Sequence, residues 1–410
     1  MGASVVLIEA GVLGGAALNS GAVPIRALQA AAREPGIAFP AAMERVRRTV
    51  AALSVNVSAE RLEGLGVTVC PGFGRFTGPA EVTVNDTTVR ARRFVIATGA
   101  APLVPAALDN APYLTWETVW QLRERPEALV VVGGGAEAVA LAQAFRRLGS
   151  AVTLQAPSRL LPDEDEELAD VVRLALRRDG IDLREAADTA APLPGTVLVA
   201  GERRPRLAGL GLEAAGIAHS EHGITVNAGL RTTNRRVYAI GDATGGPASA
   251  ALATAQAGLV LRNALFRLPV RNDLNTVPVV VVATDPELAR VGPTEAAARA
   301  IHDKLEILRW SMADVDRARI DGTTDGLAKV LLDRRGRVIG AAIAGRHAGD
   351  LILPWILAVR RRLPVTALAE LMVPSPTLSE ISKKIASSHL MPKLFNDRVR
   401  TVVRWLARLG

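Results

Sequence analysis

A glycine-rich turn at residues 133–138 is the strongest chemical signal in the sequence. An apolar run leads into Gly133-Gly134-Gly135-Ala136-Glu137-Ala138, and a helical pattern and a second apolar run at 151–155 follow. In a strand, turn, helix, strand unit, Gly133 permits the tight turn, Gly135 lets a pyrophosphate approach the backbone, and Ala138 keeps helix and sheet close. The start of the helix supplies N–H donors. We interpret the turn as nucleotide-binding; the alternative is an empty structural turn.

The second strand of this unit ends in Gln155. In such units an acid at this position binds the adenine ribose of NAD. An amide also hydrogen-bonds a ribose hydroxyl, and it tolerates a phosphate better than an acid does. The choice between NAD and NADP therefore stays open.

Two further motifs are weaker when they are read alone. Arg231-Thr232-Thr233-Asn234 precedes an apolar run that ends in Gly241-Asp242, and local physics favours an ordinary strand followed by a Gly-Asp turn. Residues 14–24 begin with Gly14-Gly15 and contain no reactive side chain. This loop before a helix either holds a phosphate or a flavin edge, or it is simply a loop.

Buried strands alternate with amphipathic helices over the first two thirds of the chain, which predicts stacked Rossmann-like α/β layers. We expect strands at residues 4–9, 92–98, 129–132, 196–200 and 236–240, and helices at 41–53, 136–148, 166–177 and 248–266. After a linker at 267–275, short strands and helices predict an α+β module. Its expected strands are 278–282, 305–308, 328–332 and 338–343, and its expected helices are 351–359 and 365–370.

Composition excludes several classes of protein. Cys70 is the only cysteine of 410 residues, so no intramolecular disulfide forms, and the five histidines show no metal-site spacing. No apolar run reaches the ~18–20 residues that cross a bilayer. The N-terminal residues resemble no secretion signal, so we expect a cytoplasmic protein. The net charge is +8, but the arginines are scattered beside acids, which does not favour nucleic-acid binding.

Taken in order along the chain, these motifs resemble the class I pyridine nucleotide-disulfide oxidoreductases, and mercuric reductase most in style. The resemblance rests on the loop at 14–28, Ala97-Thr98-Gly99, the glycine turn, residues 231–242, and the segments 283–292, 345–352 and 375–380. It implies two Rossmann-like domains for FAD and NAD(P) and an α+β dimerisation domain. The implied bounds are 1–125 and 222–268 for FAD, 126–221 for NAD(P), 270–390 for dimerisation, and 391–410 for a basic tail.

The resemblance also implies roles for residues of this chain. Glu9 would bind the FAD ribose, Asp242 would face the flavin ribitol or pyrophosphate, and Thr98 and Gly99 would lie along the cofactor. Gly14, Gly15 and Gly241 would belong to the same binding loops. A homodimer that uses FAD and NAD(P)H and passes electrons to a small-molecule acceptor is expected.

This sequence departs from the family pattern where the chemistry is done. The two redox cysteines fall on Ala17 and Ala22, and disulfide exchange needs sulfur, so disulfide or mercuric-ion reduction by the family route is excluded. Cys70 lies on an expected strand, where a packed apolar cysteine is the better interpretation.

The charged and proton-transferring groups change as well. The lysine near the flavin becomes Arg26, and its glutamate partner becomes Ala140. The histidine base falls on Ser375, which is no general base near neutral pH, so the retained Glu380 is expected to have nothing to orient.

Two segments of the family pattern are expected to be missing. The chain begins at what would be the second strand, so the first strand and its FAD-binding glycine turn are expected to be absent from it. Either the true start lies upstream of Met1, or FAD binding is impaired. The region between Leu183 and Val197 is too short for the additional strands of the family.

Residues 398–409 form an expected amphipathic helix, with Val399, Val402, Val403, Leu406 and Leu409 on one face and four arginines on much of the rest. It is either a docked or solvated extension or a peripheral contact with anionic lipid.

Three hypotheses for function follow. The first is a flavoenzyme that oxidises NAD(P)H and reduces a quinone, dye or oxygen directly from the flavin. The second is a non-catalytic homologue, and the third is a role in binding a membrane surface or a nucleic acid through the arginine-rich tail.

Overall fold

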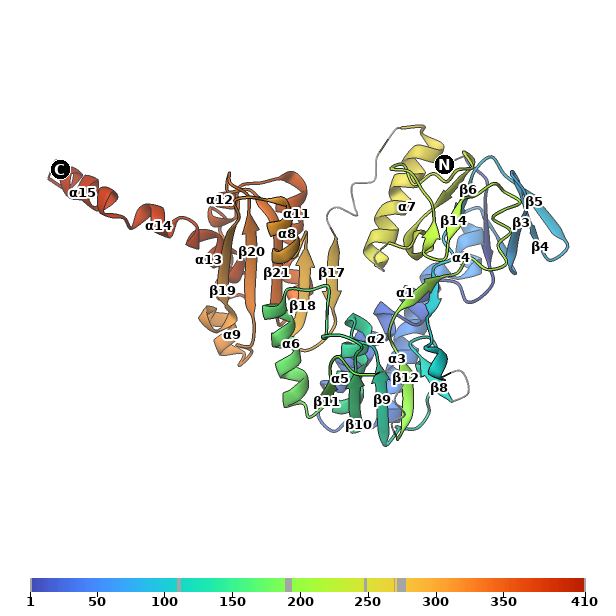
Figure 1. Cartoon of the computed structure of the whole chain (residues 1–410), viewed down its shortest axis with the longest axis horizontal. Coiled ribbons are helices and arrows are strands. Elements are labelled where there is room, and N and C mark those ends of the chain that lie inside the picture. The colour runs from blue at the N-terminus through green and yellow to red at the C-terminus, as the bar shows by residue number, and fades with distance from the viewer. Residues whose placement is uncertain are drawn as a thin grey trace. The chain divides into compact units, whose positions relative to one another are not determined.

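The computed structural model describes residues 2–108, 112–188, 194–246, 249–268, 270 and 278–408. The chain divides into two compact units. The first comprises residues 1–160 and 176–275, and the second comprises residues 161–175 and 276–410. Figure 1 shows the elements of both units along the chain. Most of the linker expected at 267–275 lies outside the described residues.

A five-stranded parallel sheet forms one part of the first unit. Its strand order is β11-β10-β9-β12-β8. The strands are β8 (Tyr113–Thr115), β9 (Ala128–Val132), β10 (Ala151–Gln155), β11 (Asp182–Arg184) and β12 (Thr196–Val199). Helix α5 (Ala136–Arg147) connects β9 to β10, and its residues 138–145 are buried. Parallel neighbours joined through a helix are the unit that the apolar runs predicted.

Two parallel strand pairs and an antiparallel sheet form the other part of this unit. β1 (Val5–Glu9) pairs with β2 (Val67–Pro71), and β6 (Phe94–Ile96) pairs with β16 (Val237–Ala239). The antiparallel sheet contains β3 (Gly74–Gly78), β4 (Glu81–Val84) and β5 (Thr87–Arg90). Further short pairs are β7 (Ala100–Pro102) with β13 (Arg203–Pro205), and β14 (His219–Ser220) with β15 (Gly223–Ile224). The remaining helices are α1 (Gly15–Asn19), α2 (Ala22–Ala32), α3 (Phe39–Ser54), α4 (Ala59–Gly64) and α7 (Ala250–Leu265).

Both strand pairs rest on the same hydrophobic core. Ile8 of β1 and Cys70 of β2 pack against a cluster that also holds Ile96 of β6, Val237 of β16 and Phe76 of β3. Cys70 is thus a partly buried, packed residue, as expected. Among the described residues, no strand pairs with the second edge of β1 or of β6.

The second unit is built on an antiparallel sheet of order β17-β18-β21-β20-β19. The strands are β17 (Val279–Val282), β18 (Glu287–Val291), β19 (Glu306–Ser311), β20 (Leu327–Leu332) and β21 (Val338–Gly345). Helix α6 (Glu166–Arg178) belongs to this unit up to residue 175. The other helices of the unit are α8 (Glu295–Ile301), α9 (Asp316–Ile320), α10 (Ala348–Leu351), α11 (Leu353–Arg361), α12 (Thr366–Ala369), α13 (Glu380–Ser388), α14 (Met391–Leu394) and α15 (Asp397–Leu406). This α+β arrangement after an α/β part confirms the expected fold class.

A network of buried charges ties the start of α6 to the sheet of the second unit. Arg290 on β18 forms an ion pair with Glu164 at 2.6 Å, and both side chains are less than a tenth exposed. Lys329 on β20 contacts the carboxylates of Asp165, Glu167 and Glu295. Because isolated buried charges are costly, each of these groups needs its partners in place.

The network shifts the pKa values of its carboxyls in both directions. Burial raises the pKa of Glu164, against the lowering effect of Arg290. The hydrogen bond from Lys329 lowers the pKa of Glu295 to about 2. Burial also works to raise the pKa of Glu167, but hydrogen bonds from Arg309 and Lys329 outweigh it and hold that pKa below its ordinary value.

No described helix is long and apolar enough to cross a membrane.

Replacing Glu295 by Gln should lower the free energy of unfolding by about 1–3 kcal/mol at pH 7, because a charge-assisted hydrogen bond to Lys329 is lost. The lowered pKa of Glu295 means that its stabilisation is fully present above pH 4.5 and disappears as the pH falls toward 2. In urea unfolding, the loss should therefore be larger at pH 7 than at pH 3. Glu370→Gln, on an exposed residue, is the matched control; an equal loss at both pH values would contradict the assignment.

Candidate dinucleotide sites

The turn after β9 leaves no room for a side chain at Gly133. This residue has φ +140°, and a Cβ atom there would lie 2.6 Å from the carbonyl oxygen of Ala200. At Gly134 a Cβ would lie 3.1 Å from the Cβ of Ala156. The turn is therefore held between the ends of β12 and β10, which fixes where α5 begins.

Gly135 is different, because a Cβ atom built there meets nothing within 4 Å. It is the N-cap of α5, and within the described residues no side-chain hydrogen bond caps the start of this helix. Ala138 is fully buried and lets α5 pack closely. An open helix N-terminus beside an open glycine has the donors and the space that a pyrophosphate requires.

Gln155, at the end of β10, is turned inward. Its side chain is buried, and Nε2 donates a hydrogen bond to the carbonyl oxygen of Asp188. The amide is thus occupied by the protein itself. Its predicted contact with an adenine ribose stays a prediction.

A second group of residues lies where parallel strands of the other part of this unit end. Glu9 ends β1, Thr98 and Gly99 follow β6, and Gly241 and Asp242 follow β16. Oε1 of Glu9 accepts the N–H of Gly11 at 2.8 Å, and the Thr98 hydroxyl donates to the carbonyl of Arg206 at 2.9 Å. Gly241 has φ +62°, and its N–H donates to Oε1 of Gln256 at 2.7 Å.

Arg203 on β13 links the two groups. Its guanidinium bonds Glu137 in the first turn of α5 at 2.6 Å and lies 3.6 Å from Oδ2 of Asp242. It also stacks on the ring of the buried Trp116, 4.3 Å from the centroid. Burial raises the pKa of Asp242, Arg203 opposes that shift, and Glu137 adds to it. Neither Arg203 nor Trp116 was singled out from the sequence; the isolated acid at Glu137 was the available signal.

The glycine-rich loop carries Ala17 on α1 and Ala22 as the first residue of α2. Gly14 has φ +103°, and a Cβ there would collide with the side chain of Leu18 at 2.5 Å. Ala17 is partly buried, and Ala22 and Arg26 are exposed. Methyl side chains offer no electron pair for thiol chemistry.

Ala140, where the resemblance implies a glutamate in other members of the family, contacts α2 through its backbone. Ala140 is buried on α5, and its carbonyl oxygen accepts a hydrogen bond of 2.7 Å from Nε2 of Gln29 on α2. An amide from α2 therefore contacts the backbone of α5 there.

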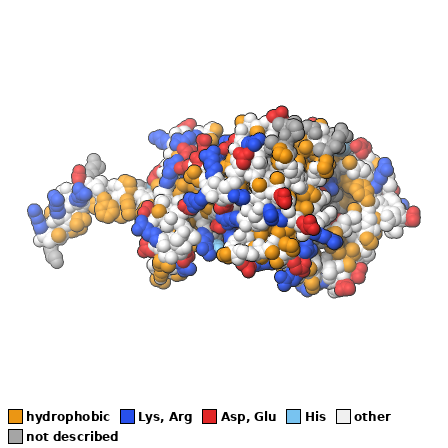
Figure 2. Space-filling model, turned by 90° about the horizontal axis from the view of Figure 1, so that it is seen from below, with side chains coloured by type: hydrophobic (Ala, Val, Ile, Leu, Met, Phe, Trp, Pro, Cys, Tyr) orange, Lys and Arg blue, Asp and Glu red, His pale blue; other side chains and the backbone are white. Residues whose placement is uncertain are grey.

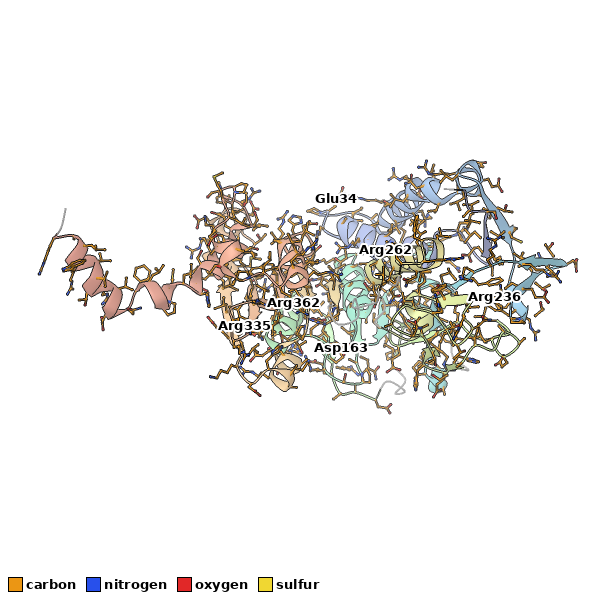
Figure 3. The ribbon with its side chains drawn as sticks, turned by 90° about the horizontal axis from the view of Figure 1, so that it is seen from above. Glu34, Asp163, Arg236, Arg262, Arg335 and Arg362 are labelled. Carbon is orange, nitrogen blue, oxygen red and sulfur yellow. The ribbon has the colours of Figure 1, made fainter. Side chains whose placement is uncertain are left out.

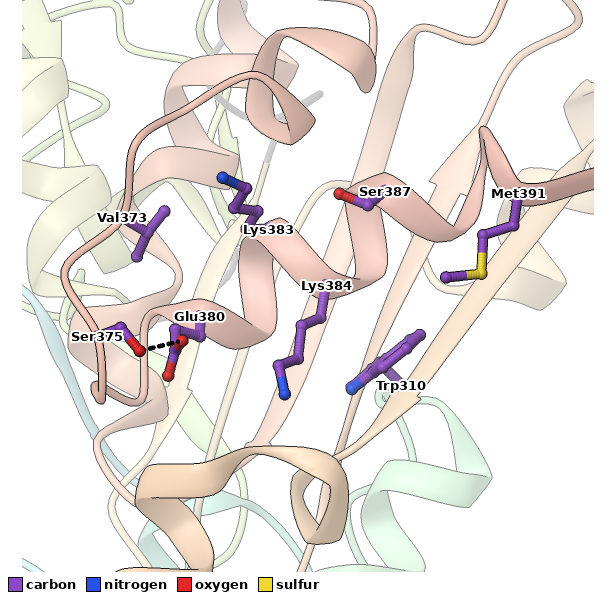
Figure 4. A pocket seen from close by; sticks show the side chains of 8 residues that line it. All are labelled: Trp310, Val373, Ser375, Glu380, Lys383, Lys384, Ser387 and Met391. Atoms are coloured by element: carbon purple, nitrogen blue, oxygen red, sulfur yellow. Dashed lines mark hydrogen bonds between the residues drawn. The ribbon is translucent and has the colours of Figure 1, made fainter. Parts of the chain in front are cut away.

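In the second unit, the carboxylate of Glu380 accepts two hydrogen bonds. The Ser375 hydroxyl donates to Oε1 of Glu380 at 2.8 Å, and the Thr377 N–H donates to Oε2 at 3.2 Å. The expectation that Glu380 has nothing to orient is therefore wrong, because its carboxylate accepts hydrogen bonds from the Ser375 hydroxyl and the Thr377 N–H. Figure 4 shows this pair beside Lys383, Lys384 and Trp310 in a pocket of about 410 Å³.

The fold and these sites define a two-dinucleotide oxidoreductase architecture. The described residues fit a nicotinamide dinucleotide at the open start of α5. At the strand ends, Glu9, Thr98 and Asp242 offer acceptors and a hydroxyl suited to the ribose and ribitol of a flavin dinucleotide. We identify no donors for the pyrophosphate of that flavin within the described part of the chain. There is also no group of three or more His, Cys, Asp or Glu there that could hold a metal ion.

Comparison with known proteins agrees with this architecture. The family model described as "Pyridine nucleotide-disulphide oxidoreductase" matches residues 1–191 and 193–257, and the model of the family's dimerisation domain matches residues 277–386. The chain belongs to the pyridine nucleotide-disulphide oxidoreductase family.

Similar proteins include a mercuric reductase of Streptomyces lividans, 33% identical over 94% of this chain and 91% of that protein. A dihydrolipoyl dehydrogenase of Thermus scotoductus is 34% identical over 93% of this chain and 91% of its own length. Among solved structures, the HOCl-induced flavoprotein disulfide reductase RclA from Escherichia coli superposes with a TM-score of 0.87 at 26% identity, covering 94% of both chains. The predicted family and its dimerisation domain are thereby confirmed.

Replacing Gly135 by Val should abolish tight NAD(P)H binding while the fold stays intact. The Cβ atom of the new side chain would lie over the start of α5 and meets no protein atom within 4 Å. We expect the dissociation constant to rise more than about tenfold, measured by calorimetry, with an unchanged melting temperature. Gly133→Ala is the contrast, because its Cβ collides with Ala200 and should lower the melting temperature. Unchanged binding by Gly135→Val would contradict the phosphate site.

Replacing Arg203 by Gln should destabilise the protein by about 1–3 kcal/mol. The loss should be greater at pH 7 than at pH 3, because burial raises the pKa of Asp242, and the protonated carboxyl no longer needs its cation at the lower pH. Thermal melts at the two pH values provide the test. Arg204→Gln, on the neighbouring exposed residue, is the control, and a loss that shrinks with rising pH would refute this account.

Proposed function

We propose that this protein is an FAD-dependent NAD(P)H oxidoreductase that delivers electrons from the flavin directly to a small acceptor, without a redox disulfide. The proposal rests on Ala17 and Ala22, which the family resemblance assigns to the two cysteine positions, and on the glycine turn at the start of α5. The proposed NAD(P)H-binding turn is therefore present, whereas the cysteines that would pass electrons on to a disulfide are not.

The residues of the chain divide the binding work. The first-turn N–H groups of α5 hold the phosphates of the nicotinamide dinucleotide, and the open Gly135 admits them. Glu9 and Asp242 orient the sugar hydroxyls of the flavin. A bound flavin supplies hydride acceptance and one- or two-electron donation, which need no cysteine.

Arg203 has an electrostatic part in this division. It neutralises Glu137, whose carboxylate stands in the same helix turn that receives the phosphates. Without this cation, an acid at that place would repel a dinucleotide. The same guanidinium limits the rise in the pKa of Asp242, so that the carboxylate form is favoured.

The substrates named for similar proteins are not proposed for this chain. The names mercuric reductase and dihydrolipoyl dehydrogenase describe those similar proteins. Thiolate attack requires sulfur, and the cysteine of this chain packs on the core from β2. We propose a quinone, a dye or oxygen as the class of acceptor, and a homodimer formed through the family's dimerisation domain.

A non-catalytic homologue is the second candidate. It is motivated by the joint replacement of the two cysteines, the lysine, the glutamate and the histidine, which the resemblance assigns to Ala17, Ala22, Arg26, Ala140 and Ser375. In that case the Ser375–Glu380 and Gln29–Ala140 hydrogen bonds are parts of an inherited fold with a purely structural role.

The absorption spectrum of the FAD-reconstituted full chain separates the two candidates. We expect a yellow protein that NADPH or NADH bleaches anaerobically and that a quinone reoxidises, because the flavin itself donates the electrons. Turnover with lipoamide, glutathione disulfide or mercuric ion should stay at background. Gly135→Val should remain yellow but resist bleaching, which ties reduction to the nucleotide turn.

Two results would overturn the proposal. A chain that FAD does not reconstitute is the non-catalytic homologue. Efficient turnover of a disulfide or of mercuric ion would mean that sulfur beside the flavin is not required.

A further inference from the structure

The C-terminal helix α15 begins at Asp397, beyond residue 386, which is the last that the family's dimerisation model matches. It is a regular helix, whose start is capped by Asn396 through a 3.0 Å hydrogen bond from the Val399 N–H. The Thr401 hydroxyl also returns a hydrogen bond to the carbonyl of Asp397 within the same helix. The segment therefore lies outside the matched domain and has hydrogen bonds that stabilise the start of its own helix.

One side of this helix is apolar and uncovered. Val402, Val403 and Leu406 share a face at helical spacing, and each is more than half exposed. Phe395, just before the helix, is 67% exposed, and Trp405 is 59% exposed. Side chains of this size remain in water only at a cost, so the face needs a cover.

The opposite side of α15 is basic. Arg400, Arg404 and Arg408 are exposed there, and residues 391–410 contain five basic side chains against the single acid Asp397. Figure 2 shows blue side chains along one edge of this segment and hydrophobic ones along the other. The two properties are separated across a single helix.

We infer that α15 docks on an anionic lipid surface, with its apolar face among the acyl chains and its arginines at the headgroups. An apolar stripe bordered by a tryptophan and backed by cations has the charge complementarity and the polarity gradient of a membrane interface. A nucleic acid would satisfy the arginines and leave the valines and Leu406 exposed. A second copy would cover the apolar face but bring like charges together.

Vesicle co-sedimentation of the full chain tests the inference. The chain should bind vesicles that mix phosphatidylcholine and phosphatidylglycerol, and should bind phosphatidylcholine alone at least about fivefold more weakly, because each arginine near an anionic surface adds about that factor. The double variant Val402→Asp/Leu406→Asp should lose binding to both. Its exposed sites leave the fold intact, which the NAD(P)H affinity of the variant reports separately.

Charge variants separate electrostatic docking from unspecific adhesion. Arg400→Glu/Arg404→Glu should lower binding to the anionic vesicles by more than about tenfold, and added salt should reproduce that loss. The control Arg334→Glu/Arg335→Glu makes the same charge change at an exposed turn between β20 and β21, where Figure 3 labels Arg335, and should bind as wild type. Trp405→Phe should remove the fluorescence shift that vesicles induce.

Three outcomes would overturn the inference. These are equal binding to neutral and anionic vesicles, full binding by Val402→Asp/Leu406→Asp, or no vesicle binding at all. A change in sedimentation velocity caused by Val402→Asp/Leu406→Asp, without vesicle binding by wild type, would assign the face to a second copy instead.

Discussion

The close approach of Gly133 to Ala200 is the constraint on which the five-stranded parallel sheet and helix α5 depend. Because no Cβ fits between β9 and the end of β12, the chain must turn sharply there, and α5 begins at a fixed place. Its first turn carries Glu137, which holds Arg203. Its middle presents the Ala140 carbonyl to Gln29, and its end packs Phe145 on Phe39 of α3 with ring centroids 5.7 Å apart. The absence of a Cβ atom at Gly133 thus determines where α5 makes its contacts with β13, α2 and α3.

The sequence predicted much of this fold because its parallel strands are continuous apolar runs. β9, β12 and β21 lie where that pattern placed them. β18 was missed, since Glu287 and Arg290 give it the look of a surface segment. Both are buried, because Glu287 accepts the Gly349 N–H and Arg290 pairs with Glu164, and partners this distant along the chain leave no local signal.

The candidate sites were predictable in their backbone and less so in their side chains. Glycines at 133 and 135 indicate a turn, because few other residues adopt the backbone geometry at 133 or leave open space over the helix start at 135. The inward orientation of Gln155 and the bridge through Arg203 depend on where other strands bring Asp188 and Asp242. The Ser375–Glu380 bond shows the same limit: residue types indicated a lost base, but only the fold reveals that the hydroxyl still reaches the carboxylate.

Among the described residues, β1 and β6 each have one unpaired edge, and this has a consequence for any measurement of assembly. Unpaired backbone amides along the sequence Val-Val-Leu-Ile, with no lysine or proline to discourage pairing, are a template for strand addition between molecules. Concentrated samples can therefore associate through these strands as well as through the dimerisation domain. A dimer seen by mass alone does not reveal which of the two surfaces has joined, and amide protection along residues 5–9 distinguishes them.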